Sequence, residues 1–282
     1  MLHPPQAIAR GVTGTLPPFW KTDGVITPPA YLSPSSISTW RQCPQKFKLS
    51  RIDRIPEPPT WHTHLGNFVH EVLESLYKSD PDERTVEHLR ALAAANWAGQ
   101  GWQEKVESLT EPMGSVADFK RQAFSCMTNL YQLENPQETD FDGMETEVMV
   151  AVEGVQMKGF IDRFAFADDG IVISDYKTGK IPDERYTSED DKFFQLLAYA
   201  LMLQESDQEA TSRVQLLYLA KPVVHELAVT PVRLSIAKGT IVETKESLDN
   251  SCATGEFHCA TGKLCDWCHY KKTGVCPAFA GK

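Results

Sequence analysis

The fold of this chain is decided by residues 159–179, which read GFIDRFAFADDGIVISDYKTG. Apolar and polar residues alternate over 155–167, and a second, largely apolar run covers 171–176, as expected for two β-strands. Asp168-Asp169-Gly170 lies between them and is typical of a hairpin turn, because aspartate and glycine tolerate the backbone angles that such turns require. This stretch therefore predicts two antiparallel strands that form a hairpin.

Two carboxylates and one ammonium group gather on this hairpin. Asp175 and Lys177 are two residues apart on the second strand, so their side chains share a face, and strand pairing brings Asp162 into their neighbourhood. Two carboxylates on one face suit a hard divalent cation such as Mg²⁺ or Mn²⁺. The adjacent ammonium can orient a water molecule or stabilise the charge of a phosphate. The alternative is a strand-end aspartate beside an exposed lysine, since this spacing also arises by chance.

The hairpin belongs to a longer succession of strands and helices. A further strand, 147–152, precedes it and is joined to it by a turn at Glu153-Gly154. Downstream, the periodicity predicts a helix over 192–204, strands over 214–220 and 227–232, and a helix over 234–248. Upstream, helical spacing covers 66–77, 87–97 and 116–133. This order predicts an α/β domain with a central sheet.

The N-terminal part of the chain has a different composition. Residues 1–34 contain seven prolines and little periodicity, so we expect an extended or poorly ordered lead-in. A helix capped by Ser35 or Ser36 follows, and Pro44 is expected to interrupt it and open a second turn. Residues 41–54 hold five basic side chains against one acid and form the most basic part of the chain.

The overall composition is that of an ordinary globular protein. Its 282 residues, 41% of them hydrophobic, allow one or two domains with a sizeable core. A net charge of −10 excludes a polycationic coat for nucleic acid. No apolar run approaches the about 18 residues that a membrane span requires. Residues 1–20 lack the apolar core of a signal peptide, so we expect a cytoplasmic protein without membrane contact.

Three of the seven cysteines, Cys265, Cys268 and Cys276, lie close together near the C-terminus. The two residues between the first pair allow both thiolates to bind one iron or zinc ion, and the expected intracellular location favours metal ligation over disulfides. A fourth ligand is required, and the nearby candidates are Cys252, His258, Cys259 and His269. Spacing alone favours a compact zinc site. Cys126 is expected in the core.

Four motifs resemble those of the PD-(D/E)xK nuclease superfamily, and specifically of its RecB-like branch. In chain order they are Gly66-x-x-x-His70, Gly159-x-x-Asp162-Arg163, Asp175-Tyr176-Lys177-Thr178-Gly179 and Gln195-x-x-x-Tyr199. They extend over residues 66–199, and the second acid is aspartate where many members have glutamate. The resemblance implies a restriction-endonuclease-like α/β fold, in which helices flank a central mixed sheet.

The resemblance also implies a role for the residues of these motifs. His70, Asp162 and Asp175 would ligate Mg²⁺ or Mn²⁺, helped by the backbone carbonyl of Tyr176. Lys177 would assist the attacking water. Without this context, His70 lies at the edge of an apolar stripe and could equally be a core histidine with satisfied hydrogen bonds.

Further residues would lie beside this site. The resemblance places Gln195 and Tyr199 where they contact DNA or brace the lysine, although residues one helical turn apart could simply be a packed pair. Arg41 and Lys46, in the basic segment, are candidates to bind DNA phosphates. Glu147, in the strand that precedes the hairpin, could be a further acidic member of the site.

The cysteines fit a second feature of the same branch. Some RecB-like nucleases, among them AddB-type helicase–nuclease subunits and the CRISPR-associated exonucleases, bind a [4Fe–4S] cluster through one cysteine before the nuclease motifs and three after them. Cys43 stands in the first place, and Cys265, Cys268 and Cys276 match the other three. The resemblance thus implies an iron–sulfur cluster in place of Zn²⁺. Cys252 and Cys259 lie outside the pattern and leave the ligand set open.

These resemblances imply a metal-dependent DNA nuclease. It would be an exonuclease that hydrolyses phosphodiester bonds in single-stranded or unwound DNA during repair or recombination. The chain has no P-loop motif, so a partner helicase or recombination factor would supply unwinding. The lead-in, 1–34, would precede a single nuclease domain, 35–282, with its core over 66–232 and the cluster joining 35–50 to 250–282.

Two other classes of protein compete with this interpretation. One is a non-catalytic DNA-binding or scaffold subunit that keeps the fold and the metal centre. The intact Asp162, Asp175 and Lys177 argue against it, because a degenerate nuclease is expected to lose at least one of them. The other is a zinc-bearing interaction protein whose acidic residues only solvate its surface.

Overall fold

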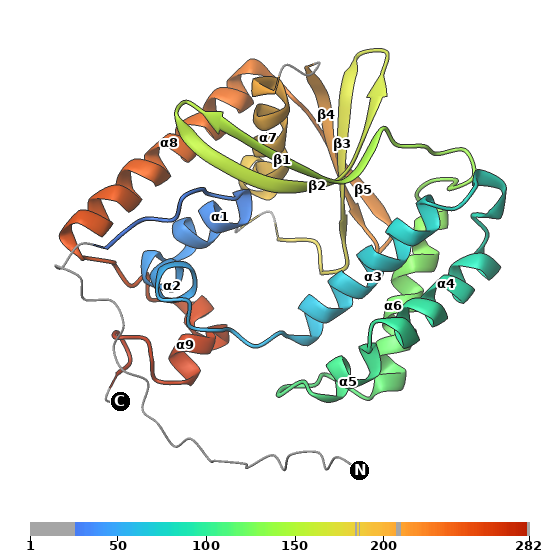
Figure 1. The fold of residues 1–282 in the computed structure, drawn as a ribbon, viewed down its shortest axis with the longest axis horizontal. Helices are drawn as coiled ribbons and strands as arrows, with labels where there is room; N and C mark the ends of the chain where they lie inside the picture. Colours follow the sequence, from blue (N-terminus) through green and yellow to red (C-terminus); the bar gives the residue numbers. More distant parts are fainter. Residues whose placement is uncertain (1–25, 184, 186, 207–209, 281–282) are drawn as a thin grey trace, which may run out of the picture.

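A mixed five-stranded sheet lies at the centre of the computed structural model, which describes residues 26–183, 185, 187–206 and 210–280 (Figure 1). Its strands follow the chain order, and only β3 and β4 run parallel. They are β1 (Gly143–Val152), β2 (Val155–Ala167), β3 (Gly170–Lys177), β4 (Thr211–Tyr218) and β5 (Val223–Ala228). The predicted central mixed sheet is confirmed, whereas the lead-in up to residue 25 lies outside the described residues.

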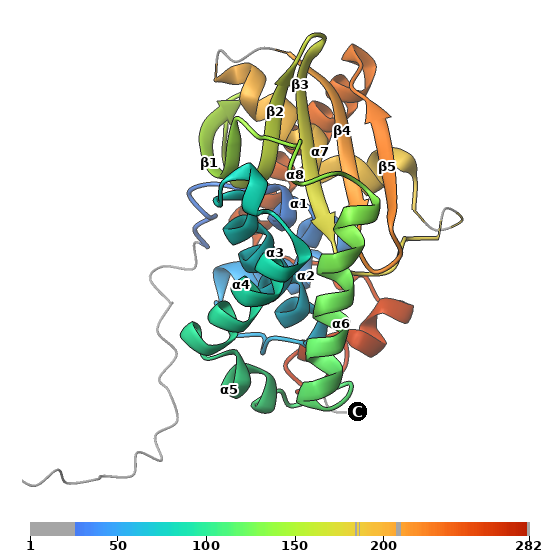
Figure 2. The same ribbon diagram turned by 90° about the vertical axis from the view of Figure 1, so that its right-hand side faces the viewer.

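Two groups of helices cover the sheet (Figures 1 and 2). One core joins helices α1, α7 and α8 to all five strands, through buried residues such as Ile161, Ile173 and Val214. A second core is formed by the four helices from α3 through α6, and it meets the sheet at Tyr176 and Leu217. The helices are α1 (Pro34–Gln42), α2 (Pro44–Phe47), α3 (Trp61–Tyr77), α4 (Val86–Gly99), α5 (Trp102–Glu107), α6 (Val116–Asn129), α7 (Glu189–Glu205), α8 (Pro231–Thr254) and α9 (His269–Lys272).

Several element boundaries differ from the sequence-based expectation. The cap of α1 is Ser33 and neither Ser35 nor Ser36, because proline takes the first helical position and the Ser33 hydroxyl accepts from the Ser36 amide. Helix α3 begins at Trp61, five residues before the expected start, behind a Thr60 cap. The short helix α5 was not predicted, since its six residues are too few to show a clear period.

Two tight turns set the register of the first three strands. Glu153 and Gly154 have φ angles of 48° and 78°, as a two-residue hairpin turn requires, and Val152 pairs with Val155. The next turn pairs Ala167 with Gly170. Pairing of β2 with β3 extends only to Arg163 and Ser174, although both strands continue, so the two strands diverge at that point.

The N- and C-terminal parts of the described chain lie side by side (Figure 1). The Gln45 amide donates to the His258 carbonyl at 3.0 Å, and the Tyr270 hydroxyl donates to the Ile55 carbonyl at 2.9 Å. A small apolar cluster around Leu49, Tyr270 and Cys276 joins the same segments. None of the helices in the described ranges is long and apolar enough to cross a membrane.

Candidate active site

Where β2 and β3 diverge, the backbone amide and carbonyl of Tyr176 bond to side chains, whereas a regular strand ladder would pair them with β2. The Tyr176 amide donates to Oδ2 of Asp162 at 3.4 Å, and its carbonyl oxygen lies 3.0 Å from Nε2 of His70. This carbonyl, which stays a prediction as a metal ligand, is thus within hydrogen-bond distance of the imidazole. Because a carbonyl only accepts, Nε2 of His70 carries the proton of the neutral ring. The lone pair of Nδ1 is therefore directed to the other side of the ring, which is the form of histidine that binds metals.

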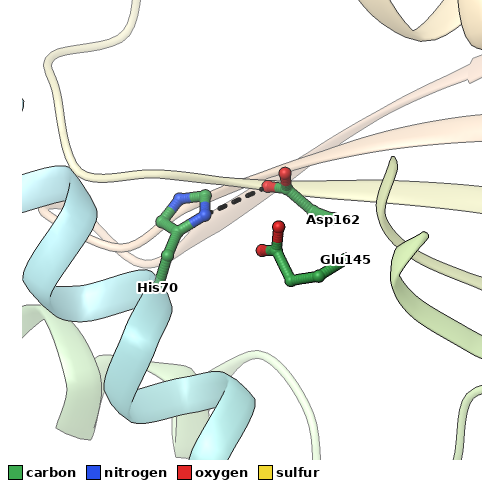
Figure 3. Close-up of side chains that lie close together, drawn as sticks. All are labelled: His70, Glu145 and Asp162. Atoms are coloured by element: carbon green, nitrogen blue, oxygen red, sulfur yellow. Dashed lines mark ion pairs between the residues drawn. The ribbon is translucent and has the colours of Figure 1, made fainter. Parts of the chain in front are cut away.

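An imidazole and two carboxylates converge beside this point of divergence (Figure 3). Nδ1 of His70, on α3, lies 3.3 Å from Oδ2 of Asp162, on β2. Ligand atoms of His70, Asp162 and Glu145 all lie within 4.8 Å of one another. Oxygen ligands with one imidazole suit a divalent cation such as Mg²⁺ or Mn²⁺, so these side chains form a candidate metal site.

Glu145 is a member of this group that the sequence-based reasoning missed. Its φ angle of 44° is rarely adopted by residues other than glycine, and such strain is typical of functional sites. Glu147, the expected acidic residue, instead forms an ion pair with Lys158 at 3.1 Å. A signal was available, because a two-residue turn at Glu153-Gly154 sets a register that carries Glu145, and not Glu147, to the position opposite Asp162.

The second motif acid and the motif lysine contact each other directly. Asp175 is 3% exposed and forms an ion pair with Lys177. Nζ of Lys177 lies 3.5 Å from Oε1 of Gln195, and the Gln195 side-chain amide lies 3.5 Å from the Tyr199 hydroxyl. The structure thus brings these four residues together, with Gln195 and Tyr199 of α7 beside the lysine.

Burial and crowding of charge change the protonation of this site. The pKa of Asp162 is raised, first by burial and then by the neighbouring Asp175 and Glu145 carboxylates. Burial also raises the pKa of Glu145 and lowers the pKa of His70. Without a cation the site therefore favours protonated carboxyl groups and a neutral imidazole. A bound cation would favour the ionised carboxylates by supplying positive charge, and it would keep the imidazole neutral, because a histidine ligand needs its free lone pair.

A buried guanidinium, that of Arg163, lies next to the candidate metal ligands, because Arg163 follows Asp162 on β2. Arg163, 2% exposed, donates to the two carboxylate oxygens of Glu134 at 2.6 and 2.8 Å and to the hydroxyl oxygen of Tyr176 at 2.6 Å. The Tyr77 hydroxyl, on the helix that carries His70, donates to the same carboxylate. The Glu134 carboxylate is required inside the protein to balance Arg163.

Five of the seven cysteines line a separate cavity of about 410 Å³. Cys43 enters it from between α1 and α2, and the rest come from the segment after α8: Cys259, Cys265, Cys268 and Cys276. Cys252 and Cys126 are instead buried in the two large cores, so Cys252 is removed from the candidate ligands. The Cys259 thiol contacts that of Cys276, and burial raises the pKa of Cys259.

The two basic candidates lie outside the group around Asp162. Arg41 forms an ion pair with Asp191 in the first turn of α7, at 2.6 Å, and its guanidinium lies over the Phe194 ring. Lys46 is half-buried and lines the cysteine cavity. Arg41 is therefore already neutralised by a carboxylate, and both residues stay predictions as DNA contacts.

The chain resembles several known proteins. An uncharacterized protein of Rickettsia bellii is 26% identical over 175 residues, which cover 56% of this chain and only 20% of that protein. The chain thus matches about a fifth of the length of this relative. The Gene 69 protein of Mycobacterium phage L5 is 24% identical over 207 residues, which cover 60% of this chain and 69% of the phage protein.

A solved structure shares the fold. The crystal structure of a candidate exonuclease from Eubacterium rectale aligns with a TM-score of 0.56 at 15% identity, covering 86% of this chain and 88% of that chain. The family model of the PD-(D/E)XK nuclease superfamily matches residues 31–277, which include every candidate ligand described above. On this match the chain belongs to the PD-(D/E)XK nuclease superfamily.

Proposed function

We propose that this protein is a DNA nuclease that hydrolyses phosphodiester bonds with the help of Mg²⁺ or Mn²⁺. The observation that carries the proposal is the convergence of His70 and Asp162 beside the Asp175–Lys177 ion pair, where β2 and β3 diverge. Such a cation, when bound, supplies positive charge that polarises the phosphate and acidifies a water molecule. The crowded carboxyl groups fit a cation, because they otherwise hold protons.

The protein side chains would divide the remaining work. His70, Asp162 and Asp175 would hold the cation, with Glu145 as a further oxygen donor and the Tyr176 carbonyl keeping His70 in its metal-binding form. The Lys177 ammonium would orient the attacking water and stabilise the charge that develops on the phosphate.

Gln195 would keep the Lys177 ammonium in place. Its side-chain oxygen lies within 3.5 Å of Nζ of Lys177, and Tyr199 lies next to the side-chain amide of Gln195. Both residues project from α7, a long helix packed on the sheet, so they would limit the positions that the lysine can adopt.

We further propose that the substrate is single-stranded or unwound DNA with free ends, as in repair or recombination. The structural neighbour described as a candidate exonuclease supports cleavage from ends. The chain has no P-loop, so a helicase or recombination factor is the expected partner.

The cysteine cavity supports the iron–sulfur subtype. In this proposal a [4Fe–4S] cluster is bound by Cys43, Cys265, Cys268 and Cys276. Cys259, beside Cys276, is the alternative fourth ligand. Zn²⁺, held by the same thiolates, is the alternative.

The experiment that tests the catalytic proposal compares the wild-type protein with Lys177→Ala. End-labelled single- and double-stranded DNA is incubated with each protein in Mg²⁺, Mn²⁺ or EDTA. We expect metal-dependent cleavage that falls by at least about 100-fold in Lys177→Ala, the usual scale for a lost electrostatic catalyst.

Lys238→Ala is the matched control, because Lys238 is an exposed lysine paired with Glu153 and should leave cleavage unchanged. Equal cleavage by wild type and Lys177→Ala would contradict the proposed catalytic role of Lys177. Metal binding without cleavage of any DNA would favour the non-catalytic DNA-binding subunit.

A further inference from the structure

An exposed apolar patch lies on the outer face of β1 and β2. Tyr31, Met149 and Phe160 are 46%, 58% and 48% exposed, which is unusual for side chains of this size. Nζ of Lys158 lies 5.8 Å from the ring centroids of both Tyr31 and Phe160, and Lys158 pairs directly with Met149 across the strands. We call these four residues the aromatic platform.

The platform continues directly into the candidate active site. Burial alternates without interruption along β2 from Val155 to Arg163, so Lys158, Phe160 and Asp162 share one face of the strand. Phe160 is two residues from Asp162, a separation of about 7 Å along a strand. A polymer bound with one phosphate at Asp162 would therefore place its next unit beside the Phe160 ring.

The backbone that presents these rings is firmly held. Tyr199 packs against Gly159 so closely that a Cβ atom there would lie 2.5 Å from Cε1 of Tyr199. Tyr31 is held by its neighbour Leu32, which pairs with Gln156 and Lys158 on the edge that β3 leaves free. Both rings can thus stack on a ligand with little loss of conformational entropy.

We propose that the aromatic platform stacks the bases of an unpaired nucleic-acid strand next to the catalytic centre, with Lys158 contacting the backbone phosphate. This inference rests on the proposed nuclease function and specifies its substrate as unpaired. Alternating aromatic rings and a cation match the exposed bases and the phosphates of a single strand, whereas a duplex hides the faces of its bases. The Lys158–Glu147 ion pair is partly exposed, so a phosphate can replace it at small cost.

The test measures binding of a fluorescein-labelled oligothymidylate by anisotropy, with every variant in the Lys177→Ala background so that the DNA stays intact. We expect Phe160→Ala to weaken binding roughly 5- to 100-fold, the range found when one stacked base loses its aromatic partner. Phe160→Trp should retain binding. A blunt-ended duplex of two complementary strands should bind both proteins equally.

Phe166→Ala is the matched control, because Phe166 lies on the same strand with 47% exposure but on the far side of Asp162. Equal losses in Phe160→Ala and Phe166→Ala would overturn the platform, as would an equal loss of duplex binding. Unchanged binding by Phe160→Ala would overturn it as well and would mark the patch as a surface for another protein. These binding results do not depend on cleavage, so a failure of the nuclease proposal would be seen separately in the Lys177 comparison.

Discussion

At the scale of single residues, Arg163 connects the parts of the proposed metal site. It follows Asp162 on β2, donates to Tyr176 beside Asp175, and shares Glu134 with Tyr77, which lies two turns beyond His70 on α3. A buried charge costs several kcal/mol unless a partner compensates it. The Arg163–Glu134 pair therefore holds helix α3 at a defined distance from the sheet.

Replacing Glu134 should destabilise the protein strongly. Glu134→Gln leaves the Arg163 guanidinium buried without a full countercharge, and we expect a loss of about 3–5 kcal/mol in the free energy of unfolding. Urea denaturation measures this loss. Glu138→Gln is the control, since Glu138 lies exposed four residues further along the chain and should change stability by less than about 0.5 kcal/mol. Similar losses in the two variants would contradict the role of the buried pair.

In the metal-free protein, the buried Asp162 carboxyl should reduce the free energy of unfolding at high pH, because the site is built to bind a metal ion. Its pKa in the folded protein is raised above the unfolded value by burial and by Asp175, so the folded state binds more protons. This contribution to stability is complete at acidic pH and is lost as the pH rises through the raised pKa.

Asp162→Asn should therefore stabilise the metal-free protein at pH 8 and have little effect at pH 5. We expect a gain on the order of 1 kcal/mol at pH 8 in EDTA. Mn²⁺ should then stabilise the wild type but not this variant. Thermal and urea unfolding at the two pH values measure both effects, with Asp168→Asn in the exposed turn as the control. A variant less stable than wild type in EDTA at pH 8 would contradict the expectation.

At the scale of elements, the hairpin β1–β2 decides which glutamate reaches the metal site. Glu145 and Glu147 lie two residues apart on β1, yet only Glu145 approaches His70 and Asp162. The tight turn at Glu153-Gly154 sets this register, and a shift by one residue would turn both side chains to the opposite face.

Glu145→Gln should accordingly weaken binding of Mn²⁺ more than Glu147→Gln does. We expect a loss of roughly 10- to 100-fold for Glu145→Gln, the range found for partners that support a metal site. Glu147→Gln, two residues away on the same strand, should change the affinity little because its carboxylate pairs with Lys158. Isothermal titration of the metal-free variants measures both affinities. The reverse order of affinities would show that the register argument is wrong.

At the scale of the whole molecule, the two ends of the described chain meet around the cysteine cavity. The contacts that join them include the Gln45–His258 and Tyr270–Ile55 hydrogen bonds, the Trp40–Phe257 ring contact and the small cluster around Leu49. Residues 35–50 also reach the large core of the central sheet, through Ile37, Trp40 and Phe47. A cluster bound by Cys43 and the C-terminal cysteines would hold the junction together.

Loss of the cluster should loosen residues 35–50 and 250–282 before the sheet. Anaerobically purified wild type should contain roughly four iron and four sulfide per chain with a broad visible absorption band, and Cys43→Ala should lose them. Hydrogen exchange should then rise in both terminal segments and stay slow in β2 and β3. Cys252→Ala, in the α8 core, is the control. A colourless wild type with one zinc per chain would contradict the cluster.

The sequence alone was sufficient for the local parts of this protein. Strand alternation and the two turns placed Asp162 near Asp175 and Lys177, because hairpin register depends only on neighbouring residues. The order of the motifs indicated the PD-(D/E)XK nuclease superfamily, which the family match confirms. Helices with a strong apolar period were found as well, while a short helix such as α5 and the cap of α1 were not.

The tertiary structure decided which side chains meet across elements. The burial of Glu134 against Arg163, the collection of Cys43 with Cys259 in one cavity, and the exposed ring of Phe160 leave no local pattern. The divergence of β2 and β3 is likewise not marked by any local sequence pattern. Local patterns report the period of one element, whereas these features depend on packing between distant segments. Packing decides that Glu134 is buried beside the Arg163 cation and that Asp162, which has no such partner, favours its protonated form. It also decides which acids stay in water.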